Sequence, residues 1–163
     1  MKKLANETEF KRWFNEVTGA IGGYGFALVA SLRQANGLPD RYFTHKRLQC
    51  FLEFKKDSNR VSELQSICLG ELMRRGTLAF VMRYMSTGWI YLELGDGTYL
   101  SALNLYKMWE TRMCERDQGD LLLSWIAYAF NRFRPLIKAS YGVDYTELPL
   151  KDCGQILASY VHD

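Results

Sequence analysis

The sequence has little of the residue types that most often build metal and nucleophilic sites. It has two histidines, His45 and His162, and four cysteines that never form a CxxC pair: Cys50, Cys68, Cys114 and Cys153. A structural zinc site takes four Cys or His ligands, commonly in closely spaced pairs, so we expect neither a metal site nor any other cofactor. We interpret the cysteines as small buried thiols in a reducing compartment.

Long hydrophobic runs are also absent. The longest, Leu121 to Phe130, is broken by Ser124 and is far shorter than the ~20 residues that cross a bilayer. The first ten residues hold two lysines with no apolar segment behind them, unlike a secretory signal. These absences predict a soluble cytoplasmic protein that has no membrane partner.

Only three prolines occur, and no low-complexity tract or repeat is visible. Hydrophobic residues make up 48% of the 163 residues, which is the composition of a folded globule. One domain spanning residues 1–163 is therefore expected. The net charge of +3 is too small to indicate a nucleic-acid partner by itself.

The N-terminal segment predicts a helix that starts at an Asn6 cap and ends at Thr18-Gly19. Phe10, Trp13, Phe14 and Val17 follow at the i, i+3, i+4, i+7 spacing of one buried face. Four glycines then fall within TGAIGGYG. A phosphate-binding loop would need a strand before the glycines and a lysine after them, so we interpret the segment as a structural connection.

The next segments are harder to assign. Phe26 to Asn36 fits a helix or a buried strand, and Gly37 followed by Leu38-Pro39 favours the helix. Residues 48–55 alternate as a strand does, although Asp40 or Thr44 could instead cap a helix. Ser58 to Gly76 predicts a helix with one shared apolar face, made by Val61, Leu64, Ile67, Cys68 and Leu72.

Leu78 to Leu103 predicts three strands joined by two tight turns. Asp96-Gly97 suits a type I′ turn. Ile90, Leu92 and Leu94 alternate with Trp89, Tyr91 and Glu93, so the first three residues should face the core. Helices are then expected from Asn104 to Cys114, from Gly119 to Phe133 and near residues 150–161, which gives an α+β fold: a small antiparallel meander of three to four strands with helices on one face.

No residues are predicted to be catalytic. His45 has no identifiable nucleophile partner, and Asp96 is explained by its turn, so Glu93 and Asp96 need not be an acid-base pair. An enzyme is accordingly the less favoured reading.

Two groups of residues are candidate binding sites. The first consists of sheet residues whose aromatic rings give large contact area at low entropic cost: Trp89, Tyr91, Glu93 and Tyr99. A covering helix would instead make the aromatic members a second core layer. The second is a basic segment interleaved with aromatic residues, which could bind single-stranded nucleic acid: Arg41, Lys46, Arg47, Lys55, Lys56 and Arg60. Asp40, Glu53 and Asp57 dilute its charge, which favours a solvated surface.

A family resemblance is carried by FVMRY at residues 80–84, GWIYLEL at residues 88–94 and DGTYL at residues 96–100. This pattern resembles part of the ArdB-type antirestriction proteins, small proteins of mobile elements that relieve type I restriction. The resemblance spans about 25 residues, and implies no catalytic residues. It implies a non-enzymatic inhibitor that binds a host protein or complex active in defence or DNA processing. The alternative from the residues themselves is a nucleic-acid-binding module using segment 41–60.

Overall fold

The computed structural model describes residues 4, 6–28, 37–151 and 154–163 of the chain. Within these residues it forms a seven-stranded sheet and six helices. The strands are β1 (Tyr24–Ala27), β2 (Arg41–His45), β3 (Leu48–Lys56), β4 (Ala79–Tyr84), β5 (Trp89–Glu93), β6 (Tyr99–Asn104) and β7 (Val161–His162). The helices are α1 (Glu7–Gly19), α2 (Glu63–Arg74), α3 (Leu105–Glu110), α4 (Glu115–Arg132), α5 (Arg134–Tyr141) and α6 (Gly154–Tyr160).

The strands lie in the sheet in the same order as in the chain, from β1 at one edge to β7 at the other. All neighbours are antiparallel except β3 and β4, which α2 connects as a parallel pair. The predicted α+β class is confirmed. The predicted sheet of three to four antiparallel strands is too small, because β1, β2, β3 and β7 extend the β4–β6 meander on both sides.

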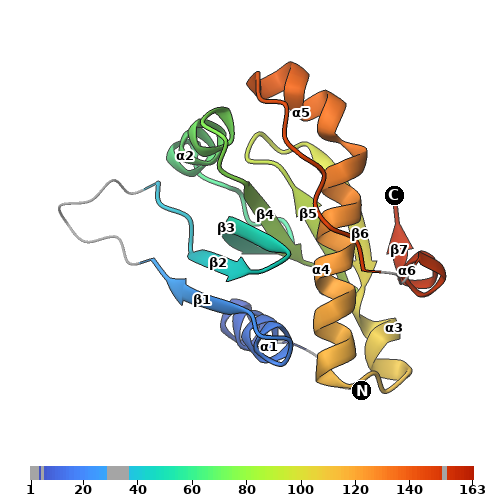
Figure 1. The fold of residues 1–163 in the computed structure, drawn as a ribbon. Coiled ribbons are helices and arrows are strands. Elements are labelled where there is room, and N and C mark those ends of the chain that lie inside the picture. The colour runs from blue at the N-terminus through green and yellow to red at the C-terminus, as the bar shows by residue number, and fades with distance from the viewer. Residues whose placement is uncertain (1–3, 5, 29–36, 152–153) are drawn as a thin grey trace.

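One face of the sheet packs on α1 and α4, as Figure 1 shows for α4 lying across β5 and β6. The Phe54 ring of β3 meets the Phe10 and Phe14 rings of α1 at centroid distances of 5.5 and 5.4 Å. The Phe80 ring of β4 meets Phe130 of α4 at 6.2 Å. The apolar side chains of these strands and helices make one continuous core.

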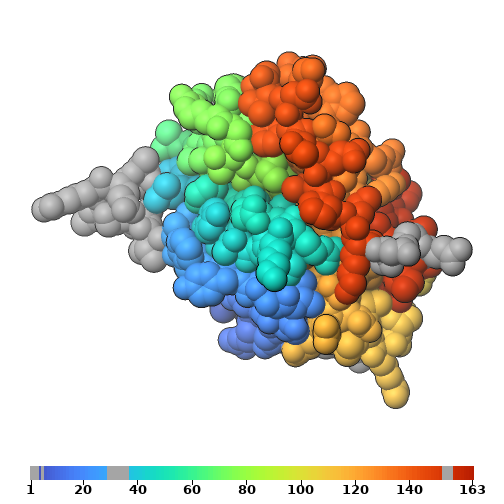
Figure 2. Space-filling model, in the orientation of Figure 1, coloured from blue at the N-terminus to red at the C-terminus, as the bar shows by residue number. Residues whose placement is uncertain are grey.

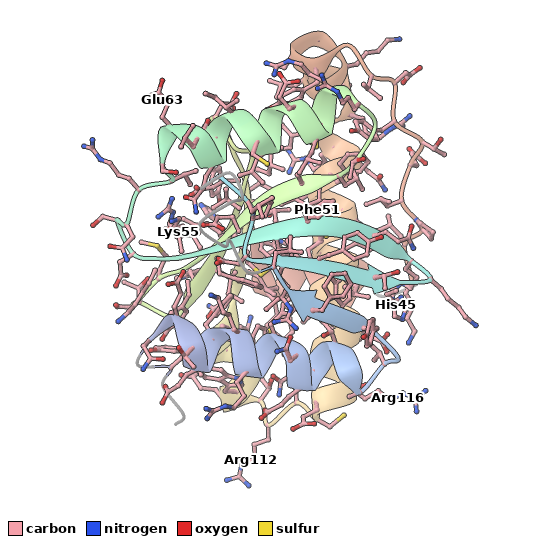
Figure 3. All side chains as sticks on the ribbon, turned by 90° about the vertical axis from the view of Figure 1, so that its left-hand side faces the viewer. His45, Phe51, Lys55, Glu63, Arg112 and Arg116 are labelled. Carbon is pink, nitrogen blue, oxygen red and sulfur yellow. The ribbon has the colours of Figure 1, made fainter. Side chains whose placement is uncertain are left out.

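The opposite face is only partly covered, by α2. Leu69 and Met73 of this helix are buried, whereas Leu64 and Ile67 are more than half exposed. The apolar face expected for the helix is therefore wrong. Its start is also later than expected, since Ser62 caps it with a reciprocal Ser62–Gln65 capping box. Helices consequently lie on both faces rather than one, and Figure 3 shows α1 and α2 on opposite sides of the sheet.

Several local predictions are confirmed. The side chain of Asn6 caps α1, whose buried stripe is the expected one, and β3 occupies the expected strand. The expectation of a helix from Phe26 fails at its start, because Phe26 and Ala27 belong to β1, and residues 29–36 lie outside the described part.

Two other features differ from the sequence expectation, the turn at Asp96-Gly97 and the end of α3. Gly97 has φ of +92° but Asp96 does not have positive φ, so the turn is not type I′. The Asp96 carboxylate instead accepts the Thr98 amide at 2.9 Å, which makes an Asx turn. Asn104 caps α3 as expected, but the helix ends at Glu110 rather than at Cys114.

Candidate functional site

The most unusual chemistry in the described structure is a pair of carboxyl groups where β2 begins, at the end of the β2–β3 pairing farthest from its turn. We call this position the β2–β3 fork. Arg41 of β2 pairs with Leu52 of β3, so the residues one step beyond that pair, Asp40 and Glu53, face each other where β2 begins. Here β2 leaves β3, and the Phe54 amide donates to the Asp40 side chain at 2.8 Å instead of to a main-chain carbonyl. The hairpin register therefore brings together two acids that lie thirteen residues apart.

Both oxygens of the Glu53 carboxylate contact hydrogen-bond donors or a positive charge. It is 1% exposed, and its Oε1 accepts the Asp40 amide at 3.0 Å. Its Oε2 accepts the Gln65 side-chain amide of α2 at 2.6 Å and lies 3.3 Å from Lys55 Nζ. Glu53 and Lys55 project from the same face of β3 because they are two residues apart in a strand.

The Asp40 carboxylate completes the cluster from the side of α1. Its Oδ1 lies 3.5 Å from Lys11 Nζ, and both side chains are about one-third exposed. Solvent therefore reaches the cluster at Asp40 and Lys11, while Glu53 lies behind them.

The pKa of Glu53 is raised to about 7, chiefly by burial and next by the negative charge of Asp40 and a hydrogen bond to it, whereas Lys55 lowers it. Two carboxylates in contact repel each other unless a proton or a cation lies between them. Glu53 therefore takes up a proton more readily than an ordinary glutamate, and a divalent cation could replace that proton.

The donor set fits a hard divalent cation. Within the described residues no cluster of three or more His, Cys, Asp and Glu side chains forms. Mg²⁺ is nevertheless commonly bound by only one or two carboxylates, with water and substrate phosphate filling the other positions. Asp40 and Glu53 supply those two carboxylates.

The six basic residues predicted to bind nucleic acid do not form one cluster. Lys46 and Arg47 lie at the turn between β2 and β3, about 26 Å along β3 from Lys55. Figure 3 shows this separation, with His45 and Lys55 toward opposite ends of the strands. Arg47 binds α4 through Asp120 at 3.2 Å and Ser124 at 2.7 Å.

Of the other members, Lys55 contacts Glu53 and Lys56 ends β3. Arg60 follows in the next loop, where it lines a hollow with Arg83 and Glu93. Arg41 begins β2 beside Asp40, and its buried Nε has no hydrogen-bond partner among the described residues. In Figure 2 the residues of β2 and β3 form the surface between α2 and the N-terminal segment.

The predicted aromatic contact residues lie on the sheet face that α2 covers only in part. Trp89, Tyr91 and Tyr99 line a hollow of about 530 Å³ together with Ala102, His162 and Asp163. Trp89 and Tyr91 are half-buried and Tyr99 is 38% exposed, so the aromatic face is neither bare nor a second core layer.

Glu93 belongs to a different environment from its aromatic neighbours. Arg83 Nε and Nη2 donate to its carboxylate at 3.0 and 3.1 Å, and Arg83 also donates to the Asp57 carbonyl at 2.8 Å. Glu93 and Arg83 line a separate hollow of about 360 Å³ beside the 57–61 loop. Glu93 is therefore occupied by an internal ion pair.

The sequence reasoning missed Asp40 and Glu53, which it treated as diluting a basic segment. The available signal was Glu53-Phe54-Lys55, where an acid and a lysine share one face of an otherwise apolar strand. Asp40 gave no separate signal, because its role depends on the β2–β3 register.

No family model and no curated protein matches the sequence. Among solved structures, the chain is similar to Hjc of Archaeoglobus fulgidus, a Holliday junction resolvase from an archaeal hyperthermophile. The TM-score is 0.44 and the sequence identity is 14%, over 60% of this chain and 87% of the resolvase chain. No helix among the described residues is long and apolar enough to span a membrane.

These findings correct two predictions. The ArdB-type resemblance is wrong, since no family model and no curated protein matches the sequence. The reading as a non-enzymatic, anti-defence inhibitor falls with it. The physical reason lies in the sheet: β5 buries Ile90 and Leu92 on α4's side and turns Trp89 and Tyr91 the other way. Any internal strand with one well-covered face can show this pattern, so it does not identify a family.

Proposed function

We propose that this protein is a divalent-cation-dependent enzyme that hydrolyses phosphodiester bonds of nucleic acid, with Asp40, Glu53 and Lys55 at its centre. The observation that carries the proposal is the contact between the two carboxyl groups beside a lysine ammonium. Burying the Glu53 carboxyl beside a second acid costs stability, and ionisable groups perturbed in this way concentrate at functional sites. Here a cation would relieve the repulsion that otherwise retains a proton.

Asp40 and Glu53 would hold the cation through their carboxylate oxygens. A divalent cation bound there would polarise a phosphoryl oxygen and lower the pKa of a coordinated water. Glu53 would release its proton to solvent as the site is loaded, and the amide of Asp40 would keep Oε1 in place at 3.0 Å.

Lys55 would act on the substrate. Its Nζ lies 3.3 Å from Glu53 Oε2, so a phosphate oxygen at the carboxylate pair would come within reach of the same ammonium. A fixed positive charge at this point would stabilise the negative charge that develops on the phosphoryl oxygens during hydrolysis.

Nucleic acid is the phosphate ester that the surroundings favour. Lys11, Arg41, Lys56 and Arg60 accompany Lys55 near one end of β3, whereas a monophosphate would need only one or two of these charges. Several lysines and arginines neutralise successive backbone phosphates and give binding that weakens with salt. This retains the nucleic-acid reading of segment 41–60 and moves its focus to the carboxylate pair.

The test is cleavage of fluorescently labelled DNA and RNA, as single strands, duplexes and four-way junctions, with Mg²⁺ or Mn²⁺ and with EDTA. We expect cation-dependent cleavage that Asp40→Asn and Glu53→Gln reduce by at least a hundredfold, and Lys55→Ala by at least tenfold. Glu71→Gln is the matched control, since Glu71 is an exposed carboxylate on α2 that pairs only with Arg74 and Arg75.

Cleavage that survives both carboxylate substitutions would refute the proposal, because a contaminating nuclease or another site would then be responsible. Hydrolysis of p-nitrophenyl phosphate without cleavage of any nucleic acid would assign the centre to a phosphatase instead.

A further inference from the structure

Gln65 of α2 links the start of that helix to the carboxylate pair. Its Oε1 accepts the Ser62 backbone amide at 3.1 Å, and its own backbone amide donates to Ser62 Oγ at 3.1 Å. A backbone N–H can only donate, so the Ser62 contact fixes which end of the Gln65 amide is oxygen. The Nε2 group must then point away from Ser62, and it donates to Glu53 Oε2 at 2.6 Å.

This arrangement gives Gln65 one fixed role toward Glu53, that of donor. Lys55 also approaches Glu53 Oε2, but at the longer distance of 3.3 Å and through an ammonium at the end of a side chain with four rotatable bonds. The Gln65 amide is held at both ends, so it determines the carboxylate orientation better than Lys55 does. Groups that hydrogen-bond to a cation-binding carboxylate in this way typically affect affinity or activity by 10–100-fold.

We infer that Gln65 is a positioning residue: its side-chain amide, oriented by the Ser62 backbone, holds the Glu53 carboxylate toward Asp40 in the orientation in which the pair binds a divalent cation. The inference rests on the function proposed above. It assigns α2, which lies on the opposite face of the sheet from α1, a part in assembling the centre. Asp40 would be steadied from the α1 side by Lys11, and Glu53 from the α2 side by Gln65.

The test compares two variants, each of which removes one hydrogen bond of the capping box. Gln65→Met keeps the length and approximate volume of the side chain but has no amide. The Ser62 N–H therefore loses its acceptor, and Glu53 Oε2 loses one of its donors. Ser62→Ala removes the bond to Ser62 Oγ and leaves the Gln65 amide with both its partners. Each loses half of the same helix cap, and Gln65→Met also loses its bond to Glu53, so the melting temperature of each variant is measured before its Mn²⁺ affinity.

Mn²⁺ affinity, measured as free Mn²⁺ by electron paramagnetic resonance, separates the two variants without relying on catalysis. We expect Gln65→Met to weaken Mn²⁺ binding about tenfold or more, and Ser62→Ala to change it by less than twofold. For nucleic-acid cleavage at saturating Mn²⁺, Gln65→Met should lower kcat and leave KM nearly unchanged, because the amide does not contact the substrate.

Each alternative outcome has a distinct meaning. If wild-type protein and folded Gln65→Met bind Mn²⁺ equally, Gln65 has no positioning role and the proposed centre stands. Equal weakening in both variants makes the effect one of helix stability and also overturns the role. If the wild-type protein binds no Mn²⁺, both this inference and the proposed function fail.

Discussion

At the scale of single residues, Glu53 is the central residue of the proposed site. It is an acid in the middle of a strand, buried to 1% exposure, and it shares hydrogen bonds with a lysine, an amide and another acid. Such a group is expensive to bury and is compensated only in part by its partners. Its position at the β2–β3 fork is better explained by the proposed cation site than by a contribution to stability.

The raised pKa of Glu53 gives a prediction about pH. A carboxyl whose pKa rises from about 4.5 when unfolded to about 7 when folded contributes stability below the lower value, and loses that contribution as pH rises to the upper value. For the wild-type protein in EDTA, the loss is expected to be of the order of 3 kcal/mol between pH 4.5 and 7.

Glu53→Gln should remove this slope, since a glutamine amide does not titrate and can donate to Asp40 permanently. Urea unfolding at half-unit pH intervals measures it. An unchanged slope in Glu53→Gln would assign the pH dependence to other groups.

At the scale of elements, close helix packing places α1 and its Lys11 at the site. A Cβ added to Gly119 of α4 would lie 2.1 Å from the Val17 carbonyl of α1, so the two helices touch through this glycine. Trp13 Nε1 also donates to Gln118 Oε1 at 2.9 Å across the same contact.

Gly119→Ala should therefore destabilise the protein by about 2 kcal/mol or more, although alanine favours an isolated helix by about 1 kcal/mol. Gly70→Ala in α2 is the matched control: its Cβ would meet the movable end of Arg74 at 3.3 Å and Tyr141 at an ordinary contact distance of 3.9 Å, and we expect it to be neutral or stabilising. Thermal and urea unfolding of both variants checks the opposite signs. A stabilised Gly119→Ala protein would mean that α1 and α4 can separate without cost.

The elements also show what the sequence could and could not predict. The stripe of Phe10, Trp13, Phe14 and Val17 sufficed for α1, because all four residues face the core. The same reasoning failed for α2, where Leu64 and Ile67 are exposed and the buried residues are Leu69 and Met73. This helix has apolar residues on more than one side, and only its packing against the sheet determines which of them are buried.

The site was less predictable than the fold. Glu53 and Lys55 could be placed on one strand face from their spacing, but Asp40 joins them only through the hairpin register and Gln65 only through the crossover helix. Residues that meet by tertiary pairing leave no local pattern. The basic segment likewise read as one surface, although β3 separates Arg47 from Lys55 by most of its length.

At the scale of the whole molecule, cation binding at the fork should stabilise the folded chain, because the carboxylate pair exists only when β2, β3 and α2 are assembled. A ligand at one hundred times its Kd adds about 2.7 kcal/mol to the free energy of unfolding. We expect Mn²⁺ at pH 8 to raise the Tm of the wild-type protein and to leave that of Asp40→Asn unchanged. A shift of the same size in both, measured by differential scanning fluorimetry, would locate the cation elsewhere.

The strand order described above has a consequence for how the chain folds. From β1 to β6 each strand pairs with its neighbour in sequence, so this part of the sheet can grow by successive closures of local connections, which cost little chain entropy, whereas β7 joins β6 only after α3, α4, α5 and α6. The contact of α1 with α4 is different. Trp13 and Gln118 are 105 residues apart, and the chain between them includes strands β1 to β6. Folding should therefore finish with the docking of α1, and the candidate centre, which takes Lys11 from that helix, would be complete only at this last step.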